Sequence, residues 1–301
     1  MNTDRLQAFC LVGQNGGLLR AAQKLKLSPA TVSLRLKHLE NELGVQLFER
    51  RPNKLLLTDK GKLFLTQAQR ILQQIDDSVA SLREEQGRCE GNVSVLVGSD
   101  MAHFFAPRIA RFVESYPQVN LKILVNPSPD SLELLIGGQG DFAIGRFLKV
   151  PRSLATFPLF TSSIAAIFDR NHPLAQRKRI TLRDLAGCGL IVTSLYSAIR
   201  RIVQKAFASQ GLEMRTVLET GECSLISEYT KMKLGVGLVH EACIQGKLDA
   251  NVRARDLKHL FGRLDVVLLY RKDRLMTAAQ KKFIEAISAQ TELGKIHNAG
   301  A

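Results

Sequence analysis

Hydrophobic residues in the first 58 positions recur at helical spacing, and glycines interrupt them sharply. The spacing predicts three helices, over about 3–12, 18–25 and 29–43. Ser28 and Pro29 are a typical helix start, a capping hydroxyl followed by a proline in the first turn, and Gly44 is a typical end. The buried stripe of the third helix is predicted to comprise Val32, Leu36, Leu39 and Leu43.

The opposite face of the third helix carries small, polar and basic side chains. Two short helices joined by a tight turn, the second with such a face exposed, are typical of a helix-turn-helix that enters the major groove of DNA. An ordinary helical hairpin with a solvated face fits the same pattern about equally well. The candidate DNA-contacting residues here are Ser28, Pro29, Ala30, Thr31, Ser33, Leu34, Arg35 and Lys37.

A basic turn follows these helices and leads into an apolar strand at about 55–57. This arrangement suits a wing that lies along the DNA backbone, where contacts with phosphates give affinity and salt dependence rather than sequence choice. A charged hairpin loop without DNA contacts is the alternative. The candidate DNA-contacting residues of the wing are Arg50, Arg51, Asn53 and Lys54.

A long helix is predicted over 59–86, capped by Thr58. At the usual rise per residue it would span roughly 42 Å. Its apolar residues follow one another at spacings of three and four, which is a heptad seam. Such a stripe needs a partner, and self-association is favoured over packing on the chain's own C-terminal half. The seam comprises Leu65, Ala68, Leu72, Ile75, Val79 and Leu82.

From about residue 92 the pattern changes to alternating short strands and helices. Strands are predicted at 93–97, 121–125, 142–145, 164–168, 190–192, 216–219, 236–239 and 265–270, and helices at 131–136, 182–185, 198–210, 225–234 and 278–289, with a further helix ending near 116. Alternating elements favour parallel sheets covered by helices, and about 200 residues suit two lobes of about 100 each. Ligands in such folds bind in the cleft at the carboxyl ends of strands.

Loops after the predicted strands carry polar residues that could hold a small ligand. Positions 99–101 and 193–194 each follow a strand and open a helix, where free backbone amides can hold an anion. For each hydroxyl, capping a helix is a slightly better interpretation than binding a ligand. The candidate effector-binding residues are Ser99, Asp100, Met101, Arg146, Thr193, Ser194 and Ser197.

Composition adds the broad class of the protein. The chain has 301 residues, 45% hydrophobic and 23% charged, which is typical of a soluble globular protein with two domains. No apolar run approaches the roughly 18 residues of a membrane span, and the start of the chain lacks the apolar core of a signal peptide. We therefore expect a cytoplasmic protein with no membrane partner.

Charge favours a nucleic-acid partner. The formal net charge is +14. Residues 1–70 hold 12 Lys and Arg against 5 Asp and Glu, and residues 91–301 hold 28 against 18, so positive charge is densest at the N-terminal end. Dense positive charge favours contact with phosphates, although many basic proteins bind no nucleic acid.

Motifs for catalysis and metal binding are missing from the sequence. The five cysteines are scattered and form no CxxC pair, so neither a zinc site nor a disulfide framework is expected. There is no GxSxG elbow, P-loop, GxGxxG after a strand or HExxH. We expect no enzyme, no cofactor and no metal. The histidines interpreted as structural or exposed rather than as ligands are His103, His172 and His240.

A run of motifs in the N-terminal segment resembles the signature of LysR-type regulators over about 60 residues. These motifs are Ala21-Ala22-Gln23-Lys24-Leu25, Leu27-Ser28, Val32-Ser33, Leu39-Glu40-Asn41-Glu42-Leu43-Gly44, Leu47-Phe48-Glu49-Arg50 and Leu57-Thr58-Asp59-Lys60-Gly61. The C-terminal part is similar to the effector domain of the same family, through Asn171-His172-Pro173-Leu174-Ala175, Asp184-Leu185-Ala186 and Leu234-Gly235-Val236-Gly237-Leu238.

The resemblance implies an α/β fold with an N-terminal domain rich in α-helix: a winged helix-turn-helix, a dimerising linker helix and a two-lobed effector domain like a periplasmic binding protein. It also implies a dimer, or a dimer of dimers, on promoter DNA, with activation or repression modulated by a small effector. The loops at 99–101 and 193–194 favour a polar or anionic effector, and RNA polymerase is a further candidate partner. The expected divisions are a DNA-binding domain over 1–58, a linker over 59–90, and an effector domain over 91–301, with lobe I at about 91–161 and 267–301 and lobe II at about 162–266.

The recognition helix departs from the family at two positions. Many members have Gln where this chain has Pro29 and Arg where it has Leu34. The nearest cation that could contact guanine is Arg35, and Leu34 could pack on a thymine methyl group.

The expected function is therefore a sequence-specific transcriptional regulator that responds to a small molecule. A DNA-binding regulator without a ligand is the first alternative. A solute-binding protein is the second, but the N-terminal segment argues against it.

Overall fold

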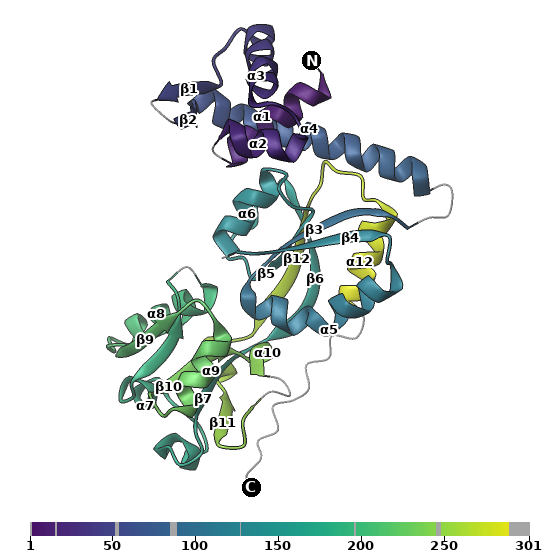
Figure 1. The fold of residues 1–301 in the computed structure, drawn as a ribbon. Helices are drawn as coiled ribbons and strands as arrows, with labels where there is room; N and C mark the ends of the chain where they lie inside the picture. The colour runs from purple at the N-terminus through teal and green to yellow at the C-terminus, as the bar shows by residue number, and fades with distance from the viewer. Residues whose placement is uncertain are drawn as a thin grey trace. The chain divides into compact units, whose positions relative to one another are not determined.

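The computed structural model describes residues 2–15, 17–51, 54–84, 89–126, 128–195, 197–244 and 248–288. Contacts divide the chain into two compact units (Figure 1). The first unit comprises residues 1–88 with the short segments 136–139 and 274–277, and the second comprises the rest.

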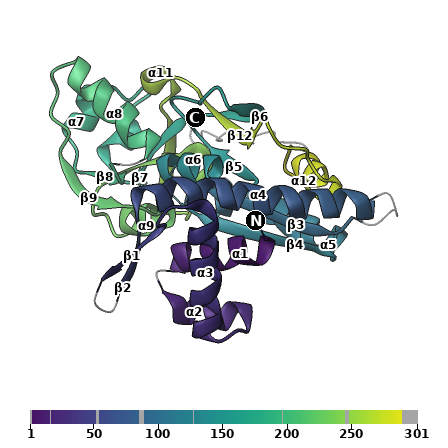
Figure 2. The same cartoon turned by 90° about the horizontal axis from the view of Figure 1, so that it is seen from above.

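The first unit is a helical domain with a small hairpin. Its elements are α1 (Thr3–Asn15), α2 (Leu18–Leu25), α3 (Pro29–Leu43), β1 (Phe48–Arg51), β2 (Lys54–Leu57) and α4 (Asp59–Glu84). The two strands pair antiparallel. Figure 2 shows the hairpin and α3 projecting from the same side of α4. The helices pack around a core that includes Leu6, Phe9, Val12, Ala21, Ala22, Val32, Leu36, Leu39 and Phe48.

Local sequence signals explain where α3 begins and ends. The side chain of Ser28 accepts a hydrogen bond from the backbone amide of Thr31 at 3.1 Å, and Pro29 occupies the first turn. Gly44 ends the helix in the left-handed conformation, with φ 68°. Of the predicted stripe, Val32, Leu36 and Leu39 are buried and Leu43 is partly buried against the same core.

Several motif residues of this unit hold the hairpin and α4 in place. One carboxylate oxygen of Glu40 accepts hydrogen bonds from the backbone amide of Leu47 at 2.7 Å and from the next amide at 3.1 Å. The hydroxyl of Thr58 donates to the carbonyl of Gln46 at 2.9 Å and accepts from the amide of Gly61 at 2.9 Å. A Cβ atom on Gly61 would lie 2.1 Å from the carbonyl oxygen of Leu47, so only glycine permits this approach.

The second unit contains two five-stranded sheets, each of which defines a lobe (Figure 1). Lobe I has the strand order β4 (Val119–Val125), β3 (Gly91–Val97), β5 (Phe142–Gly145), β12 (Leu264–Arg271), β6 (Leu154–Ser162). Lobe II has the order β11 (Val252–Asp256), β7 (Ile164–Asp169), β10 (Val236–His240), β8 (Leu190–Thr193), β9 (Thr216–Thr220). The helices are α5 (Ser99–Ser115), α6 (Ser128–Ile136), α7 (Leu182–Ala186), α8 (Ala198–Ser209), α9 (Cys223–Lys231), α10 (Glu241–Ile244), α11 (Lys258–Phe261) and α12 (Ala278–Ser288), with a 3-10 turn η1 (Pro173–Gln176).

The sheets are mixed, which corrects the expectation of parallel sheets. Strand β3 runs parallel to β4 and β5, and β8 runs parallel to β9 and β10. Strand β12 is antiparallel to β5 and β6, and β7 is antiparallel to β10 and β11. The reason is that β7 enters lobe II from β6 of lobe I, and β12 enters lobe I from lobe II after the short α11. Neither strand is joined to its predecessor by a helical crossover within one sheet, which parallel neighbours require.

Strands β6 and β11 were absent from the sequence expectations. Both lie at the edge of a sheet. Strand β6 contains Pro158, which can sit in a sheet only where its missing amide is not needed, and three of the five residues of β11 are charged: Arg253, Arg255 and Asp256. Their sequences therefore lack the apolar run that marks a buried strand.

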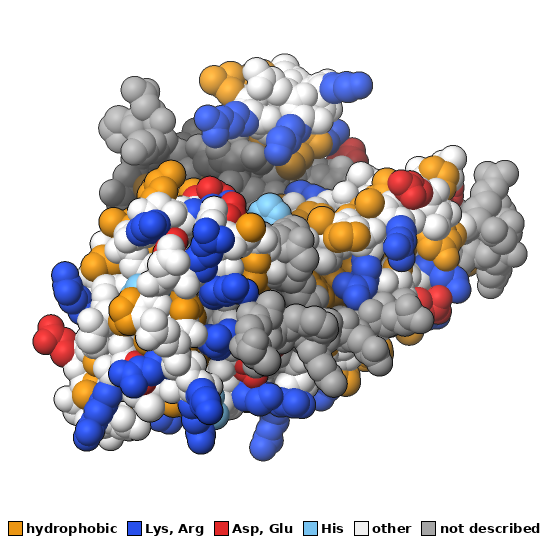
Figure 3. Space-filling view, turned by 90° about the horizontal axis from the view of Figure 1, so that it is seen from below, with side chains coloured by type: hydrophobic (Ala, Val, Ile, Leu, Met, Phe, Trp, Pro, Cys, Tyr) orange, Lys and Arg blue, Asp and Glu red, His pale blue; other side chains and the backbone are white. Residues whose placement is uncertain are grey.

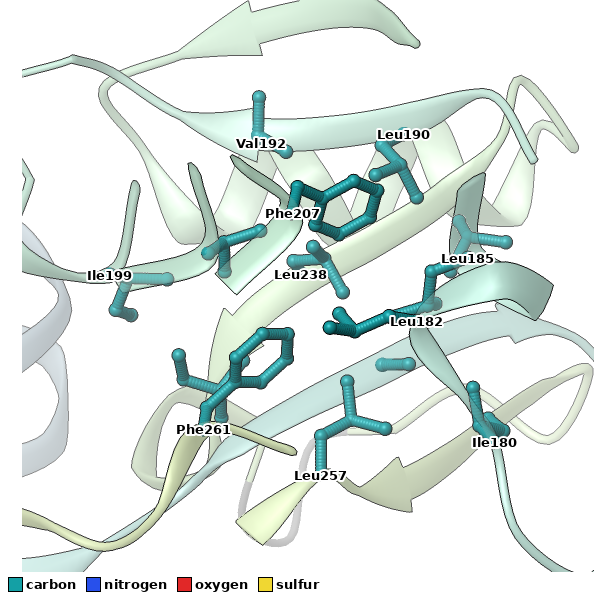
Figure 4. Close-up of a cluster of buried hydrophobic side chains, with 14 of the residues drawn as sticks. Ile180, Leu182, Leu185, Leu190, Val192, Ile199, Phe207, Leu238, Leu257 and Phe261 are labelled. Carbon is teal, nitrogen blue, oxygen red and sulfur yellow. The ribbon is translucent and has the colours of Figure 1, made fainter. Parts of the chain in front are cut away.

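Lobe II is buried on both faces of its sheet. One face packs a cluster that includes Phe168, Leu190 and Leu238 under α8, with Phe207 pointing toward the strands (Figure 4). The other face packs a second cluster, which includes Ile167, Ile191, Ile226 and Val239. Central strands covered on both faces read as continuous apolar runs, which is why β7, β8 and β10 were predictable from sequence.

Candidate DNA interface and effector site

The outward face of α3 presents a mixed apolar and polar surface. Leu34 is 55% exposed, a high value for a leucine on a helix with a buried stripe. Ser28, Pro29, Ala30 and Lys37 are also exposed, and Thr31, Ser33 and Arg35 are half-buried. The hydroxyls of Ser28 and Thr31 lie 2.8 Å apart and share a hydrogen bond. Contact with DNA would compete with that bond.

Arg35 is engaged within the domain. Its Nη2 atom lies 3.0 Å from Oδ2 of Asp4 on α1, and the two side chains are 26% and 54% exposed. Both groups are partly solvated, so the ion pair contributes little to stability. The guanidinium can exchange this carboxylate for a base or a phosphate.

The wing is a short antiparallel hairpin. Strands β1 and β2 pair so that Arg51 lies opposite Lys54. The side chains of Arg50, Arg51 and Lys54 and the whole of Asn53 lie outside the described residues. Contacts by these groups remain predictions from the sequence.

The apolar seam of α4 divides into two parts. Ala68 is buried, and Leu65 and Leu72 pack against the core of the first unit. Further along, Ile75, Val79 and Leu82 are 40%, 43% and 68% exposed. The first half of the seam therefore completes the core of its own unit, and the second half is an apolar stripe open to solvent.

Two polar residues of α4 bind the short segments of the first unit, which sequence reasoning missed. Arg70 donates from Nε to the carbonyl of Ile136 at 2.8 Å. Asp77 forms an ion pair with Arg274, and the two side chains are only 12% and 7% exposed. Nothing in the local sequence marks this pairing, because the partners are 197 residues apart.

The carboxyl ends of the central strands of both lobes meet at one crossover. Strand β6 ends at Ser162 and β7 begins at Ile164, so a single residue joins the sheets. Ser162 pairs with Leu264 at the start of β12, and Ile164 pairs with His240 at the end of β10. Strands β3 and β5 of lobe I and strands β8 and β10 of lobe II therefore all end near this crossover. This is where α/β folds bind ligands.

The predicted residues of lobe II lie at this edge. Thr193 ends β8 and is 6% exposed, and its hydroxyl has no hydrogen-bond partner among the described residues. Ser194 is half-buried. Ser197 caps α8, because its side chain accepts a hydrogen bond from the amide of Ile199 at 3.2 Å. For Ser197 the capping interpretation is thus confirmed, whereas the hydroxyl of Thr193 caps no helix.

The predicted residues of lobe I differ in their exposure. Met101 is only 2% exposed and belongs to the buried part of α5. Arg146 follows β5 and is half-buried. The side chains of Ser99 and Asp100 lie outside the described residues.

His240 lies between the lobes, although sequence reasoning gave it no ligand role. It ends β10 and is fully buried, and its ring meets Phe160 of β6 edge-on, with the centroids 6.4 Å apart. Burial, and after it the guanidinium of Arg146, lower the pKa of His240 to about 3. The imidazole is therefore neutral at physiological pH. Its place at the end of a central strand was the signal that could have marked it.

The other two histidines carry no ligand signal. His103 is exposed. His172 accepts a hydrogen bond from the amide of Leu174 at 3.2 Å and so caps η1. A cavity of about 580 Å³ lies beside it, at the opposite edge of lobe II, lined by Arg177, Asp184 and Lys233 among others.

Surface charge does not by itself locate a ligand site. On the face seen in Figure 3, Lys and Arg side chains are scattered among uncharged and apolar ones. Within the described part of the chain, no cluster of three or more His, Cys, Asp or Glu is arranged to hold a metal ion. None of the described helices is long and apolar enough to cross a membrane.

Two protein-family descriptions match the chain. Residues 3–62 match "Bacterial regulatory helix-turn-helix protein, lysR family". Residues 87–292, more than half of the chain, match "LysR substrate binding domain". The chain belongs to the LysR family. It is a DNA-binding transcriptional regulator with an effector-binding domain, as the resemblance implied.

Curated relatives of this LysR-family chain are transcriptional regulators and not enzymes. It is 33% identical over 254 residues to the HTH-type transcriptional regulator CysB of Burkholderia cenocepacia, with 83% of this chain and 81% of the relative covered. It is 29% identical over 280 residues to the HTH-type transcriptional regulator Cbl of Escherichia coli, with 92% and 88% covered.

Solved structures of the family share the fold. Full-length OxyR from Pseudomonas aeruginosa matches with a TM-score of 0.75 at 22% identity, covering 96% of this chain and 93% of that one. Full-length CbnR in complex with its target DNA matches with a TM-score of 0.65 at 20% identity, covering 95% and 99%. The cofactor-binding domain of Cbl matches with a TM-score of 0.61 at 26% identity, covering 67% and 90%.

Proposed function

We propose that this LysR-family regulator responds to a small anion bound where its two lobes meet, at the carboxyl ends of the central strands. The observation that carries this proposal is the hydroxyl of Thr193, which is buried at that edge without a partner among the described residues. Buried polar groups in proteins are nearly always hydrogen-bonded, so an orphan at a strand end needs an explanation. Arg146, which follows β5 at the facing edge of lobe I, would supply the opposite charge.

Two features support the remaining partners. The exposed face of α3 and the wing would contact promoter DNA, which places the protein in the cytoplasm. The exposed half of the α4 seam would pair with a second copy, giving a dimer or a dimer of dimers.

The proposed domains are the DNA-binding domain over 1–58, the linker over 59–90 and the effector domain over 91–301. Within the effector domain, lobe I comprises 91–161 and 267–301, and lobe II comprises 162–266. RNA polymerase is a further partner of such regulators in this proposal.

Binding changes the regulator only if the anion prefers one arrangement of the lobes. A ligand shifts a conformational equilibrium by its differential affinity for the two states, and by no more than that. The groups proposed to supply that affinity are the side chains of Arg146, Thr193 and Ser194 and the backbone amides at Ser99 and Asp100. Met101 and Ser197 would act by holding α5 and α8 in place, because the first is buried and the second caps its helix.

The test removes both hydroxyls of lobe II. A thermal-shift screen of small organic acids, amino acids and inorganic anions first finds an effector by its stabilisation of the folded protein. We expect Thr193→Ala combined with Ser194→Ala to abolish the effector-dependent change in the promoter footprint, with DNA affinity in the absence of effector unchanged. Thr193→Ser keeps the hydroxyl and is the matched control.

Two results would count against the proposal. A full effector-dependent change in the double variant would exclude the site. If no compound in the screen stabilises the wild type or changes its footprint, the alternative of a DNA-binding regulator without a ligand is favoured.

A further inference from the structure

We infer that His240 is a binding residue of the effector site and donates its Nε2 hydrogen to a negatively charged oxygen of the effector, which Arg146 binds from the other lobe. The inference rests on the proposed function and names the chemical class of ligand: a small oxoanion or carboxylate. His240 was not among the candidate residues found from the sequence.

The hydrogen bonds of the ring define its tautomer. The backbone amide of Ala242 lies 3.2 Å from Nδ1 of His240. A backbone amide can only donate, so Nδ1 must carry the lone pair. A neutral imidazole has a single N–H group, and it is therefore on Nε2. The hydroxyl of Ser162, 3.4 Å away, also faces Nδ1 and leaves Nε2 untouched.

The Nε2 donor has no acceptor among the described residues, although the side chain is fully buried. A buried donor without an acceptor is destabilising, and such groups are rare in folded proteins. The nearest carboxylate in the sequence, on Glu241, accepts a hydrogen bond from the hydroxyl of Ser163 at 2.8 Å. An acceptor supplied from outside the chain resolves the imbalance.

The position of the ring fits a ligand held between the lobes. His240 ends β10 of lobe II, pairs with Ile164 beside the crossover and contacts Phe160 of lobe I. The helix that follows it, α10, packs against α5 of lobe I. A group that binds Nε2 would therefore be sensitive to how the two lobes close on each other.

The local charge selects an anion over a cation or a neutral ligand. Burial and the positive charge of Arg146 both keep the imidazole unprotonated by lowering its pKa. The site thus presents the neutral N–H group of His240 within the electrostatic influence of the Arg146 guanidinium. Two donors and one positive charge match an acceptor with negative charge. A cation would be repelled by Arg146.

The experiment compares two variants of the full chain. His240→Leu removes the N–H donor and puts an apolar side chain in its place. His240→Gln keeps an N–H group near the position of Nε2. Sulfate, phosphate, acetate and oxalate are the probes, with chloride at equal ionic strength and neutral acetamide as references. Affinity is measured at pH 7 by calorimetry, and stability by thermal unfolding.

We expect at least one of the four anions to bind the wild type, and acetamide not to bind. The Leu variant should lose affinity at least about tenfold, as for loss of one hydrogen bond to a charged group, and the Gln variant should stay within about threefold of the wild type. Preference for sulfate and phosphate would assign an inorganic oxoanion, and preference for acetate and oxalate an organic carboxylate.

A second measurement on the wild type covers the case in which the Leu variant does not fold. In protein carrying ¹⁵N-labelled histidine, the Nε2–H signal that disappears in His240→Gln should shift when the anion is added. An unshifted signal, or unchanged affinity in the Leu variant, would overturn the inference. The proposed function would still stand if the Thr193 and Ser194 double variant fails to respond to the effector. Absence of binding by all four anions to the wild type would overturn the inference together with the proposal of an anionic effector.

Discussion

Single residues of the N-terminal domain divide into those that bind the backbone and those that face outward. The side chain of Glu40 holds the loop before β1 against α3, and Thr58 and Gly61 hold the same loop against the start of α4. Their role is structural, because each of them fixes the position of a backbone segment. Leu34 and Arg35 are different, because Leu34 is exposed and the side chain of Arg35 binds the carboxylate of Asp4.

Arg35 is the residue whose role most needs a measurement. Its ion pair with Asp4 could be the whole reason for its presence, or a resting contact that DNA displaces. We predict that Arg35→Ala reduces the discrimination between DNA sequences by about 1–3 kcal/mol, the contribution of a bidentate contact with guanine.

Lys54→Ala should weaken binding to all DNA sequences and reduce the dependence of affinity on salt concentration by about one phosphate contact. Affinities for specific and random duplexes across a salt series measure both effects.

Asp4→Asn is the matched control for Arg35. It breaks the same ion pair and leaves the guanidinium free. If Arg35 reads a base, this variant should bind its site as tightly as the wild type or more tightly. If it instead reproduces the defect of Arg35→Ala, then Arg35 acts only by pairing with Asp4 and the assignment is wrong.

At the scale of elements, α4 shows one helix serving two purposes along a single apolar stripe. Leu65, Ala68 and Leu72 complete the core of the first unit. The stripe then continues onto Ile75, Val79 and Leu82, which are exposed in the single chain. A long apolar stripe on a helix is stabilised when it packs against a partner.

We predict that Val79→Glu combined with Leu82→Glu converts the proposed dimer to monomers. Two charges in a paired seam would have to be buried against each other, which is strongly unfavourable. Both side chains are exposed in the single chain, so its fold should be unaffected. Light scattering measures the mass, and binding to a half-site and a full site measures the consequence for DNA.

Gln67→Glu serves as the control for that variant, since it adds a charge to an exposed position of the same helix. It should leave the mass of the particle unchanged. A dimer of unaltered stability in the Val79 and Leu82 variant would show that the subunits associate through another surface.

At the scale of the whole molecule, the two compact units have separate cores. The cluster around Phe9 and Leu39 shares no residue with the cluster around Phe168 and Phe207. Multidomain chains with separate cores need not unfold in one step. The consequence is that stability and ligand response can be altered in one unit at a time.

We predict two calorimetric transitions that respond to different substitutions. Leu39→Ala, in the core of the first unit, should cost about 2–5 kcal/mol and lower the midpoint of one transition. Phe207→Ala, in lobe II, should cost about 3–5 kcal/mol and lower the midpoint of the other. An effector should raise only the transition that Phe207→Ala lowers. A single transition that both substitutions shift equally would show that the units unfold together.

Most helices, the central strands and the resemblance to the family could be predicted from the amino-acid sequence, whereas the edge strands β6 and β11 could not. The start and end of α3, its buried stripe and the central strands of the two lobes follow from spacing, capping and glycine positions, which act within a few residues along the chain. Such signals are local, because a helix or a covered strand is specified by its own pattern of apolar residues.

Contacts between segments far apart in the sequence could not be predicted, because they depend on the packing of the whole fold. The antiparallel course of β7 and β12, the pairing of Arg35 with Asp4 and the division of the α4 seam are not written in any local pattern. His240 shows the physical reason most clearly. Its burial, its tautomer and the influence of Arg146 on its pKa depend on Phe160, Arg146 and Ala242 coming together where the lobes join. Identical local sequence in another setting would give an ordinary solvated histidine.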